Sequence, residues 1–314
     1  MNDSENDPAD SIDQPSDSEF VNSMLIVGLG EVLWDVFPVG AKFGGAPANF
    51  ACSTAGIGSR LSKVSIVSAV GNDDLGEQAI KALQGRSVDT SALAITNYPT
   101  GRVLIQLDAD RKASYEIAAN TAWDNIPWSD KIAALANKCD AVCFGTLGQR
   151  SPNSRTTLQR FLFETLSDCY RILDVNFRAP FYDDGVIDQS LRLANVLKLS
   201  DEELPRLAQQ YDLRGDDHHI MRQLQERFQL KCVALTLGAN GAMLVRGEEL
   251  CQVAGSKVDV VDTVGAGDAF TAALTLGLLQ SNDLAAIAHH ATMVAAYVCT
   301  QAGATPSIPN ALHI

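Results

Sequence analysis

The sequence predicts an α/β fold: a mostly parallel sheet covered by helices on both faces, with a small β-hairpin lid. Over most of the 314 residues, short apolar runs typical of buried strands alternate with segments of helical spacing. The stretch at about 98–120 breaks this rhythm, because two extended runs flank Asp108-Ala109-Asp110-Arg111 in the pattern of a hairpin. Such a hairpin would project from the main sheet, where it could act as a lid.

Each element of the main sheet follows from the same pattern. The first half predicts strand 24–30, helix 46–57, strand 64–70 and helix 75–83. The second half predicts strand 141–144, helix 156–167, strands 170–176, 196–199 and 232–237, a second hairpin beginning at 241–245, and helices 269–279 and 284–299. In open α/β sheets, ligands bind at the carboxyl ends of the parallel strands, so we expect the functional loops there.

Composition narrows the class of protein. With 46% hydrophobic and 20% charged residues, the chain is typical of a soluble globular protein with a large core. No apolar run approaches the roughly 20 residues of a membrane helix, so we expect no membrane partner. The net charge of −14 argues against a nucleic-acid partner, because Lys and Arg bind phosphates. The seven cysteines lie mostly in apolar runs without a Cys-x-x-Cys pair, which favours buried thiols in a reducing cytoplasm.

Half of the net charge of −14 lies in residues 1–23, which carry seven acidic residues and no Lys or Arg. This segment cannot bury enough apolar surface to offset the entropy of ordering, and it lacks the features of a signal peptide. We interpret it as a disordered acidic tail, or an upstream extension, before a single folded domain at 24–310. The lid elements of that domain would cover about 32–43 and 98–120.

The most informative segment is Asp262-Thr263-Val264-Gly265-Ala266-Gly267-Asp268, which follows an apolar run and precedes a helix predicted to start at Asp268. Gly265 and Gly267 permit backbone conformations that aim several N–H groups at one point, and the helix N-terminus adds partial positive charge. This pocket suits an anion such as a phosphoryl group in transit. Asp268 would then accept the proton of an attacking hydroxyl; the alternative is that it only caps the helix.

The same segment resembles the C-terminal signature of the ribokinase-like (PfkB-type) carbohydrate kinases, without a break from Asp262 to Leu274. Near the N-terminus, Phe43-Gly44-Gly45-Ala46-Pro47-Ala48-Asn49-Phe50-Ala51 is similar to the family's Gly-Gly-x-x-x-Asn-x-Ala signature. The resemblance covers about 24–310. It implies a ribokinase-like, three-layer, doubly wound fold and an ATP-dependent phosphotransferase with an alcohol group as acceptor. A rival interpretation is a catalytically idle relative that binds sugar or nucleotide as a sensor.

The resemblance also implies roles for individual residues. The catalytic set would be Asp268 as base with Gly265, Ala266 and Gly267. The sugar would be held by Asp35, Gly44, Gly45, Asn49 and Arg178. ATP and Mg²⁺ would lie beside Lys198, Glu203, Thr236, Gly238 and Gly241, and K⁺ beside Asp262, Val264 and Ser307. One position departs from the family, because Ser200 replaces the Asn of its Asn-x-x-Glu motif while Glu203 is kept.

Two similarities favour fructose as the acceptor, giving fructose 6-phosphate. They are the run Gly30-Glu31-Val32-Leu33-Trp34-Asp35, which resembles the opening motif of fructokinase-like members, and the Gly-Gly-Ala-Pro-Ala-Asn stretch. Ribose, 2-keto-3-deoxygluconate and nucleosides stay open as acceptors. A sugar phosphate also stays open, because Arg102, Arg111 and Lys112 lie near the hairpin. Lid hairpins in this family often pair across dimers, so the resemblance also implies a possible homodimer through the lid.

Overall fold

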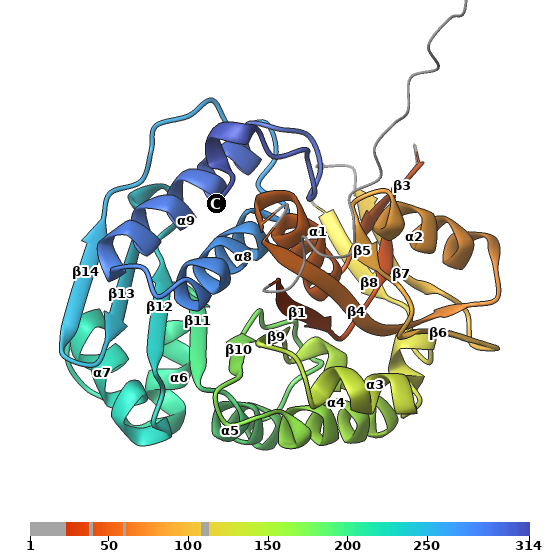
Figure 1. Cartoon of the computed structure of the whole chain (residues 1–314), viewed down its shortest axis with the longest axis horizontal. Helices are drawn as coiled ribbons and strands as arrows, with labels where there is room; N and C mark the ends of the chain where they lie inside the picture. Colours follow the sequence, from red (N-terminus) through yellow and green to blue (C-terminus); the bar gives the residue numbers. More distant parts are fainter. Residues whose placement is uncertain (1–22, 38–39, 59–60, 108–112) are drawn as a thin grey trace, which may run out of the picture.

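The computed structural model describes residues 23–37, 40–58, 61–107 and 113–314, whose elements are arranged as in Figure 1. The main sheet has the order β14-β13-β12-β11-β10-β9-β1-β4-β5, and β6 also pairs with β4. Its strands are β1 (Met24–Leu29), β4 (Ser62–Gly71), β5 (Val88–Asp89), β6 (Leu93–Thr96), β9 (Ala141–Phe144), β10 (Tyr170–Asp174), β11 (Val196–Ser200), β12 (Cys232–Thr236), β13 (Ala242–Arg246) and β14 (Glu249–Val253). The acidic segment 1–22 and the predicted turn at 108–111 lie outside the described residues.

Strand pairing confirms the predicted sheet type. The pairs that connect β5, β6, β4, β1, β9, β10, β11 and β12 are all parallel. The pairs β12–β13 and β13–β14 are antiparallel, and the second of these pairs is the predicted second hairpin. The parallel strands therefore present their carboxyl ends at one edge, which is where the cavity described below lies.

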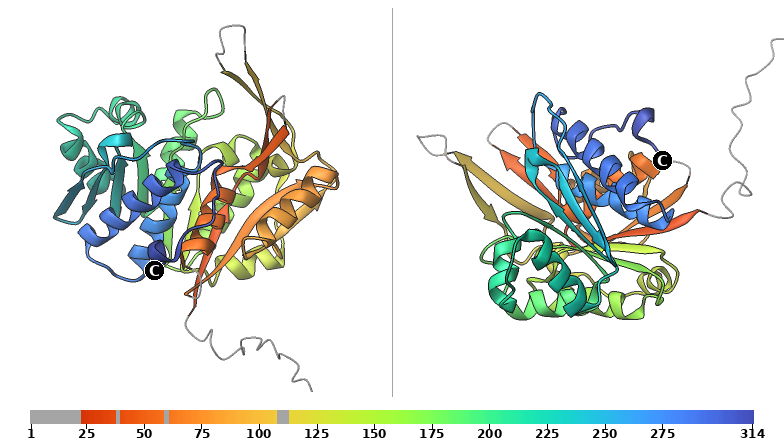
Figure 2. Two further views of the ribbon diagram at one scale, coloured as in Figure 1. Left: turned by 90° about the horizontal axis from the view of Figure 1, so that it is seen from above. Right: turned by 90° about the vertical axis from the view of Figure 1, so that its left-hand side faces the viewer.

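Helices cover both faces of the main sheet, so the fold has three layers (Figures 1 and 2). One face packs against α1 (Ala46–Gly58), α8 (Ala266–Leu279) and α9 (Leu284–Cys299), with α2 (Asp74–Gln84) beside α1. The other face packs against α3 (Asp130–Ala136), α4 (Pro152–Glu164), α5 (Asp184–Leu193), α6 (Leu204–Tyr211) and α7 (Asp217–Phe228). In β1, Ile26 belongs to the first core and its neighbours Val27 and Leu29 to the second. Both sides of the strand are thus buried, which explains its continuous apolar run.

A second, smaller sheet projects from this body (Figure 2). Its order is β3-β2-β7-β8, with strands β2 (Leu33–Phe37), β3 (Gly40–Gly44), β7 (Gly101–Leu107) and β8 (Ala113–Ile117). We call it the lid sheet. The sequence predicts one hairpin at 98–120 and a further lid element at 32–43, and the structure joins these two parts through a parallel pairing of β2 with β7.

Two predicted boundaries are wrong. Helix α8 begins at Ala266 rather than at Asp268, because Gly265 with φ +82° is its N-cap. The apolar residues Val260 and Val261 before this loop are 62% and 64% exposed and belong to no strand. Helix α4 spans Pro152–Glu164 instead of 156–167, since proline is well suited to the first turn of a helix.

Within the described residues, none of the helices combines the length and apolarity needed to cross a membrane.

Candidate active site

A cavity of about 860 Å³ lies between the lid sheet and the carboxyl ends of the central strands. The main sheet contributes Asp174 from β10 and Lys198 from β11, and the lid sheet contributes Asp35 from β2. The predicted site residues that line this cavity are Asp35, Gly45, Asn49, Arg178, Lys198, Asp262, Val264, Gly265, Gly267 and Asp268. Predicted residues from five separate segments of the chain therefore meet at this edge of the sheet.

Asp268 lines this cavity from the first turn of α8. Its Oδ2 accepts a hydrogen bond of 2.8 Å from Nδ2 of Asn49. Burial, with the nearby Asp174, raises the pKa of Asp268 to about 6, although Asn49, Lys198 and Arg178 act to lower it. A base with a pKa just below neutrality is ionised at pH 7 and still able to accept a proton.

The loop around Asp268 does not use that carboxylate as a helix cap. Gly265 is the N-cap of α8, and no side-chain capping bond is formed there within the described residues. Only glycine fits at 265, because a Cβ atom would lie 2.3 Å from the backbone oxygen of Ala304 and φ is positive. The geometry therefore favours the interpretation of Asp268 as a reactive group over its interpretation as a cap.

A buried ion pair lies under the glycine loop. Nζ of Lys198 is 3.0 Å from Oδ1 of Asp174, and the hydroxyl of Thr271 donates to Oδ2 of Asp174 at 2.9 Å. Burial acts to lower the pKa of Lys198, but Asp174 and Glu203 outweigh it, so the pKa is raised and the ammonium stays charged. A Cβ atom at Gly267 would lie 3.2 Å from that ammonium. The loop thus has a buried positive charge directly beneath it, which suits a phosphoryl group.

Sequence reasoning gave no role to Glu31, which the structure places in the cavity wall. Its side chain is buried, and its Oε2 atom has no hydrogen-bond partner among the described residues. Burial raises the pKa of Glu31 to about 7, with Asp268 adding to the rise and backbone N–H groups of Glu31 and Ala46 opposing it. The available signal was its position two residues after the end of β1, at the functional edge of the sheet.

The lid sheet supplies the outer wall of the cavity. Asp35 on β2 is half-buried, and burial raises its pKa although Arg178 and Lys42 oppose the rise. A Cβ atom at Gly44 would lie 3.1 Å from Oδ2 of Asp35, and one at Gly45 would lie 2.5 Å from the backbone oxygen of Glu31. The two glycines therefore let the start of α1 approach both acidic residues closely.

The comparison with known proteins decides the family. Residues 24–311 match the model of the pfkB family carbohydrate kinases. The chain belongs to this family. It is therefore a carbohydrate kinase, a phosphotransferase with an alcohol group as acceptor. Solved structures of the family also confirm the predicted ribokinase-like fold.

Three relatives illustrate the range of this kinase family. PH1459 of Pyrococcus horikoshii, described as an uncharacterized sugar kinase, is 29% identical over 301 residues, covering 89% of this chain and 91% of the relative. Its structure in complex with ATP has a TM-score of 0.75 at 28% identity, covering 91% of this chain and 95% of the other. An ATP-dependent 6-phosphofructokinase of Thermoanaerobacterium thermosaccharolyticum is 29% identical (85% and 82% covered), and a fructokinase of Salmonella typhimurium is 27% identical (85% and 88% covered).

Several predicted residues of this kinase do not line the cavity: Gly44, Ala266, Glu203, Thr236, Gly238, Gly241 and Ser307. Both carboxylate oxygens of Glu203 accept backbone hydrogen bonds, from Phe177 at 2.9 Å and Ser200 at 2.8 Å. Because Ser200 contributes its backbone N–H, replacement of the family's Asn leaves this contact intact. The segment that begins at Thr236 follows β12 at the same edge, since Thr236 is the register partner of Ser200.

The predicted cation loops of the kinase are held together by Asp262. Its Oδ1 accepts from the backbone N–H of Val264 at 3.1 Å, and its Oδ2 accepts from that of Gly303 at 3.1 Å. Lys42 of the lid sheet lies 3.4 Å from the same Oδ2. Burial acts to raise the pKa of Asp262, but these hydrogen bonds and Lys42 outweigh it and the pKa is lowered. In the third predicted cation-binding segment, the backbone oxygen of Ser307 accepts a hydrogen bond from the hydroxyl of Tyr297.

Proposed function

We propose that this kinase transfers the γ-phosphate of ATP to a hydroxyl of fructose and forms fructose 6-phosphate. One observation carries the proposal: a half-buried carboxylate, Asp268, is oriented by Asn49 beside a buried ammonium, Lys198, at a glycine-rich helix N-terminus. This arrangement places a proton acceptor and an anion pocket side by side. It is what phosphoryl transfer to a hydroxyl requires.

In the proposed mechanism, Asn49 holds Asp268 so that its carboxylate faces the attacking hydroxyl and accepts the proton. The backbone N–H groups of the loop 265–267 and the ammonium of Lys198 stabilise the negative charge that develops on the phosphoryl group. Asp35 would bind the sugar from the lid side. The lid sheet would exclude water from the cavity and so limit hydrolysis of ATP.

We also predict that the protein binds two cations, Mg²⁺ and K⁺. Mg²⁺ would neutralise charge on the phosphates, and Glu203 would reach it through water, because both of its oxygens already accept backbone hydrogen bonds. K⁺ would lie beside Asp262, Val264 and Ser307. The bonds from Asp262 to Val264 and Gly303 support this, since they bring two of the expected loops together. ATP would extend from the cavity along the segment 236–241.

Fructose is favoured by the Gly30–Asp35 run and by relatives that are named fructokinase. The relative named ATP-dependent 6-phosphofructokinase keeps a sugar phosphate as a second candidate, and Arg178 and Lys42 give the cavity rim the positive charge it would need. A homodimer through the lid sheet stays a prediction. The free thiol state of all seven cysteines supports the proposed cytoplasmic location.

A coupled assay of ADP release over a panel of sugars, sugar acids, sugar phosphates and nucleosides tests the proposal. We expect the highest kcat/KM for fructose, and product analysis should identify fructose 6-phosphate. A higher kcat/KM for another acceptor would replace fructose but keep the kinase. No turnover with any acceptor, despite measurable ATP binding, would favour the non-catalytic sensor and overturn the mechanism.

A further inference from the structure

The chain enters and leaves the β7–β8 hairpin of the lid sheet beside two buried threonines. Thr100 directly precedes β7, and Thr121 follows the end of β8 by four residues. Each of the two is 1% exposed. The backbone N–H of Ala122 donates to the backbone oxygen of Pro99 at 2.8 Å, so the entering and leaving segments lie side by side. We call this place the hairpin base.

Asp73 holds the entering segment at the hairpin base. Its Oδ2 accepts a hydrogen bond from the backbone N–H of Thr100 at 2.9 Å, and its Oδ1 accepts from the hydroxyl of Thr100 at 2.6 Å. The same hydroxyl accepts from the backbone N–H of Gly71, at the end of β4, at 2.9 Å. Asp73 is also the N-cap of α2, where it accepts from the backbone N–H of Gly76. The start of β7 is therefore fixed to both β4 and α2.

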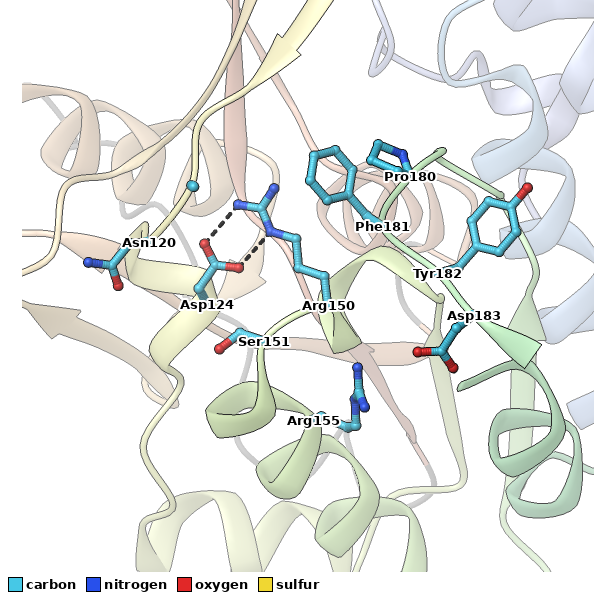
Figure 3. A pocket seen from close by; sticks show the side chains of 10 residues that line it. Asn120, Asp124, Arg150, Ser151, Arg155, Pro180, Phe181, Tyr182 and Asp183 are labelled. Carbon is cyan, nitrogen blue, oxygen red and sulfur yellow. Dashed lines mark hydrogen bonds and ion pairs between the residues drawn. The ribbon is translucent and has the colours of Figure 1, made fainter. Parts of the chain in front are cut away.

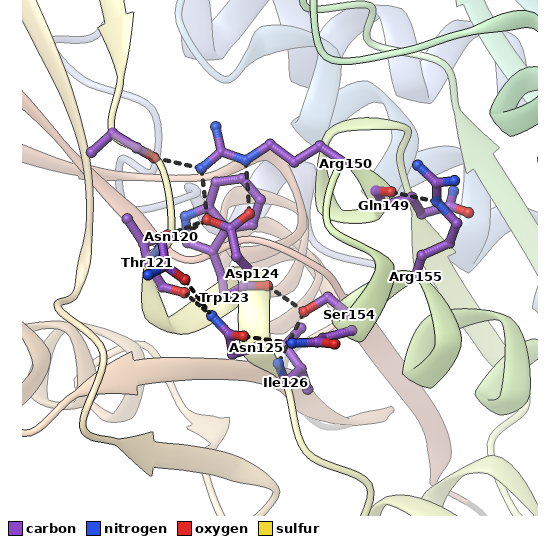
Figure 4. A network of polar contacts seen from close by, with 12 residues as sticks. Asn120, Thr121, Trp123, Asp124, Asn125, Ile126, Gln149, Arg150, Ser154 and Arg155 are labelled. Atoms are coloured by element: carbon purple, nitrogen blue, oxygen red, sulfur yellow. Dashed lines mark hydrogen bonds and ion pairs between the residues drawn. The ribbon is translucent and has the colours of Figure 1, made fainter.

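Asp124 holds the leaving segment in a similar way. Figure 4 shows it beside Thr121, whose backbone N–H and hydroxyl donate to Oδ2 at 2.9 and 3.1 Å. Asp124 belongs to the short 3-10 helix η2 (Ala122–Asn125) and also binds Arg150, whose Nε and Nη2 donate to its two oxygens at 2.7 and 2.8 Å. Nη2 of Arg150 donates as well to the backbone oxygen of Ala118, the residue after β8. The end of β8 is therefore fixed through Arg150 to the segment that precedes α4.

Arg150 also connects the hairpin base to the wall of the cavity that Asp268 lines. Its side chain is 8% exposed, and its guanidinium group lies 4.1 Å from the ring centroid of Trp123 and 4.8 Å from that of Phe181. Figure 3 shows this group with Asp124 on one side and Phe181 on the other. Phe181 is one of the residues that line the cavity. A single side chain thus supports both the end of the hairpin and an aromatic residue of the wall.

The hairpin itself contributes an apolar residue from each strand to the same wall. Val103 on β7 follows Thr100 by three residues. Ile117 on β8 precedes Thr121 by four residues. The two are register partners, and Val103 is also the register partner of Asp35, the residue that would bind the sugar. The bonds at the hairpin base are therefore only one to two residue pairs away from the part of the wall that the hairpin forms.

We propose that Asp73 and Asp124 are positioning residues of this kinase, which fix the hairpin base and thereby set the affinity for the acceptor. Each clamps one buried threonine through hydrogen bonds to a carboxylate, which are stronger than bonds between neutral groups. Neither carboxylate is among the described residues that line the cavity of Asp268, so they act through the backbone of β7 and β8. The effect on the acceptor rests on the proposed function, whereas the clamping of the hairpin base does not, and the two can fail separately.

Deletion of single hydroxyl groups tests the clamps without leaving Arg150 buried and unpaired. Thr100→Val keeps the shape of the side chain but removes the bonds that its hydroxyl forms with Asp73 and Gly71. Hydrogen–deuterium exchange of the whole protein without ligands, measured by mass spectrometry, reports on the amides of β7 and β8. We expect exchange in the hairpin to rise about tenfold, the typical effect of one hydrogen bond to a charged group, while exchange in β10 and β11 stays as in the parent.

Two further variants are the controls for this exchange experiment. Thr100→Ser keeps the hydroxyl and its bonds, so hairpin exchange should stay as in the parent. Thr157→Val removes a similarly buried hydroxyl that donates to the backbone oxygen of Ile126 at 2.7 Å, in the body of the protein. It should leave hairpin exchange unchanged, although it also lowers stability. Unchanged exchange in Thr100→Val, or an equal rise in Thr157→Val, would overturn the clamp.

Steady-state kinetics then test the positioning role, with fructose or the acceptor of highest kcat/KM in the panel varied at saturating ATP. We expect the acceptor KM to rise about threefold or more in Thr100→Val and in Thr121→Val, with kcat within about twofold and the KM of the parent restored in Thr100→Ser. A merely structural role would lower the temperature of unfolding without a change in KM. Faster hairpin exchange with the KM of the parent would therefore overturn the positioning role. If the parent turns over no acceptor, the proposed function fails with that role, and the exchange experiment still decides whether the hairpin base is clamped.

Discussion

The inner corner of the 860 Å³ cavity and its outer rim both carry carboxylates and cationic side chains, but in different surroundings. In the corner, Lys198 and Asp174 are buried and Asp268 is half-buried, and each has a defined hydrogen bond to a neighbouring side chain. On the rim, Arg178 is exposed and Lys42 pairs with Asp262 while 55% of the lysine side chain is in contact with solvent. A charge removed from water interacts several times more strongly than a screened one. The corner is therefore suited to chemistry, and the rim to the capture of substrate and the position of the lid sheet.

This difference predicts that substitutions in the corner act mainly on kcat and substitutions on the rim act mainly on KM. The largest effect is expected for Asp268→Asn. The amide keeps the shape and can still contact Asn49, but it cannot accept the proton. We expect kcat to fall by about 100-fold or more, measured as ADP release, with ATP binding kept. Asp201→Asn is the control, since Asp201 is an exposed carboxylate at the same sheet edge. A near-normal kcat for Asp268→Asn would remove this residue from the mechanism.

The second prediction separates the catalytic part of the corner from its structural part. Lys198→Met leaves Asp174 buried without its cation, which should lower the free energy of unfolding by about 3–5 kcal/mol. In Lys198→Met with Asp174→Asn, no charge is stranded, so most of this stability should return. The kcat of the double variant should stay at least about tenfold low, because the positive charge under the loop is absent. Urea unfolding and ADP release measure the two effects. Recovery of both together would make Lys198 a purely structural residue.

The pH dependence also distinguishes the corner from the rim. Because the proposed base, Asp268, has a pKa of about 6, kcat/KM should fall about tenfold per pH unit below that value. Its pKa in the folded state lies above the ordinary value of an aspartate, so its ionisation costs stability as the pH rises from about 4 to 6. Glu31, with a pKa of about 7, extends that cost to higher pH.

Two variants test which carboxyl group causes each part of this loss of stability. Asp268→Asn should lose the decline in stability between about pH 4 and 6, and Glu31→Gln should lose the part near pH 7. Thermal unfolding over this pH range measures both. A parent protein whose kcat/KM is constant between about pH 5 and 7 would contradict the role of a buried base.

The sequence could predict the sheet and the glycine loop of the candidate site because both depend on local patterns. Strands buried on both faces are continuous apolar runs, and the glycine loop with Asp268 is a contiguous segment. The partners of these residues depend on tertiary packing and were missed. Asp174 meets Lys198 only through the register of β10 with β11, and Glu31 loses its solvent only where α1 and the segment near Gly148 close over it. Val260 and Val261 show the converse, since apolar residues can also lie exposed before such a loop.

The smallest effect is expected on the rim, for Lys42→Met. This side chain links the lid sheet to Asp262 at 3.4 Å, but an exposed pair of this kind contributes about 0–1 kcal/mol. We expect the free energy of unfolding to change by less than about 1 kcal/mol and kcat to stay within about twofold. The KM for the acceptor should rise a few-fold at low salt, because the lid sheet loses a contact with the loop before α8, and the rise should shrink at high salt. Lys81→Met, which removes an exposed pair with Glu77 on α2, is the control and should leave KM unchanged. A large fall in kcat for Lys42→Met, with KM unaltered, would place this lysine in the chemical step and end the distinction between corner and rim.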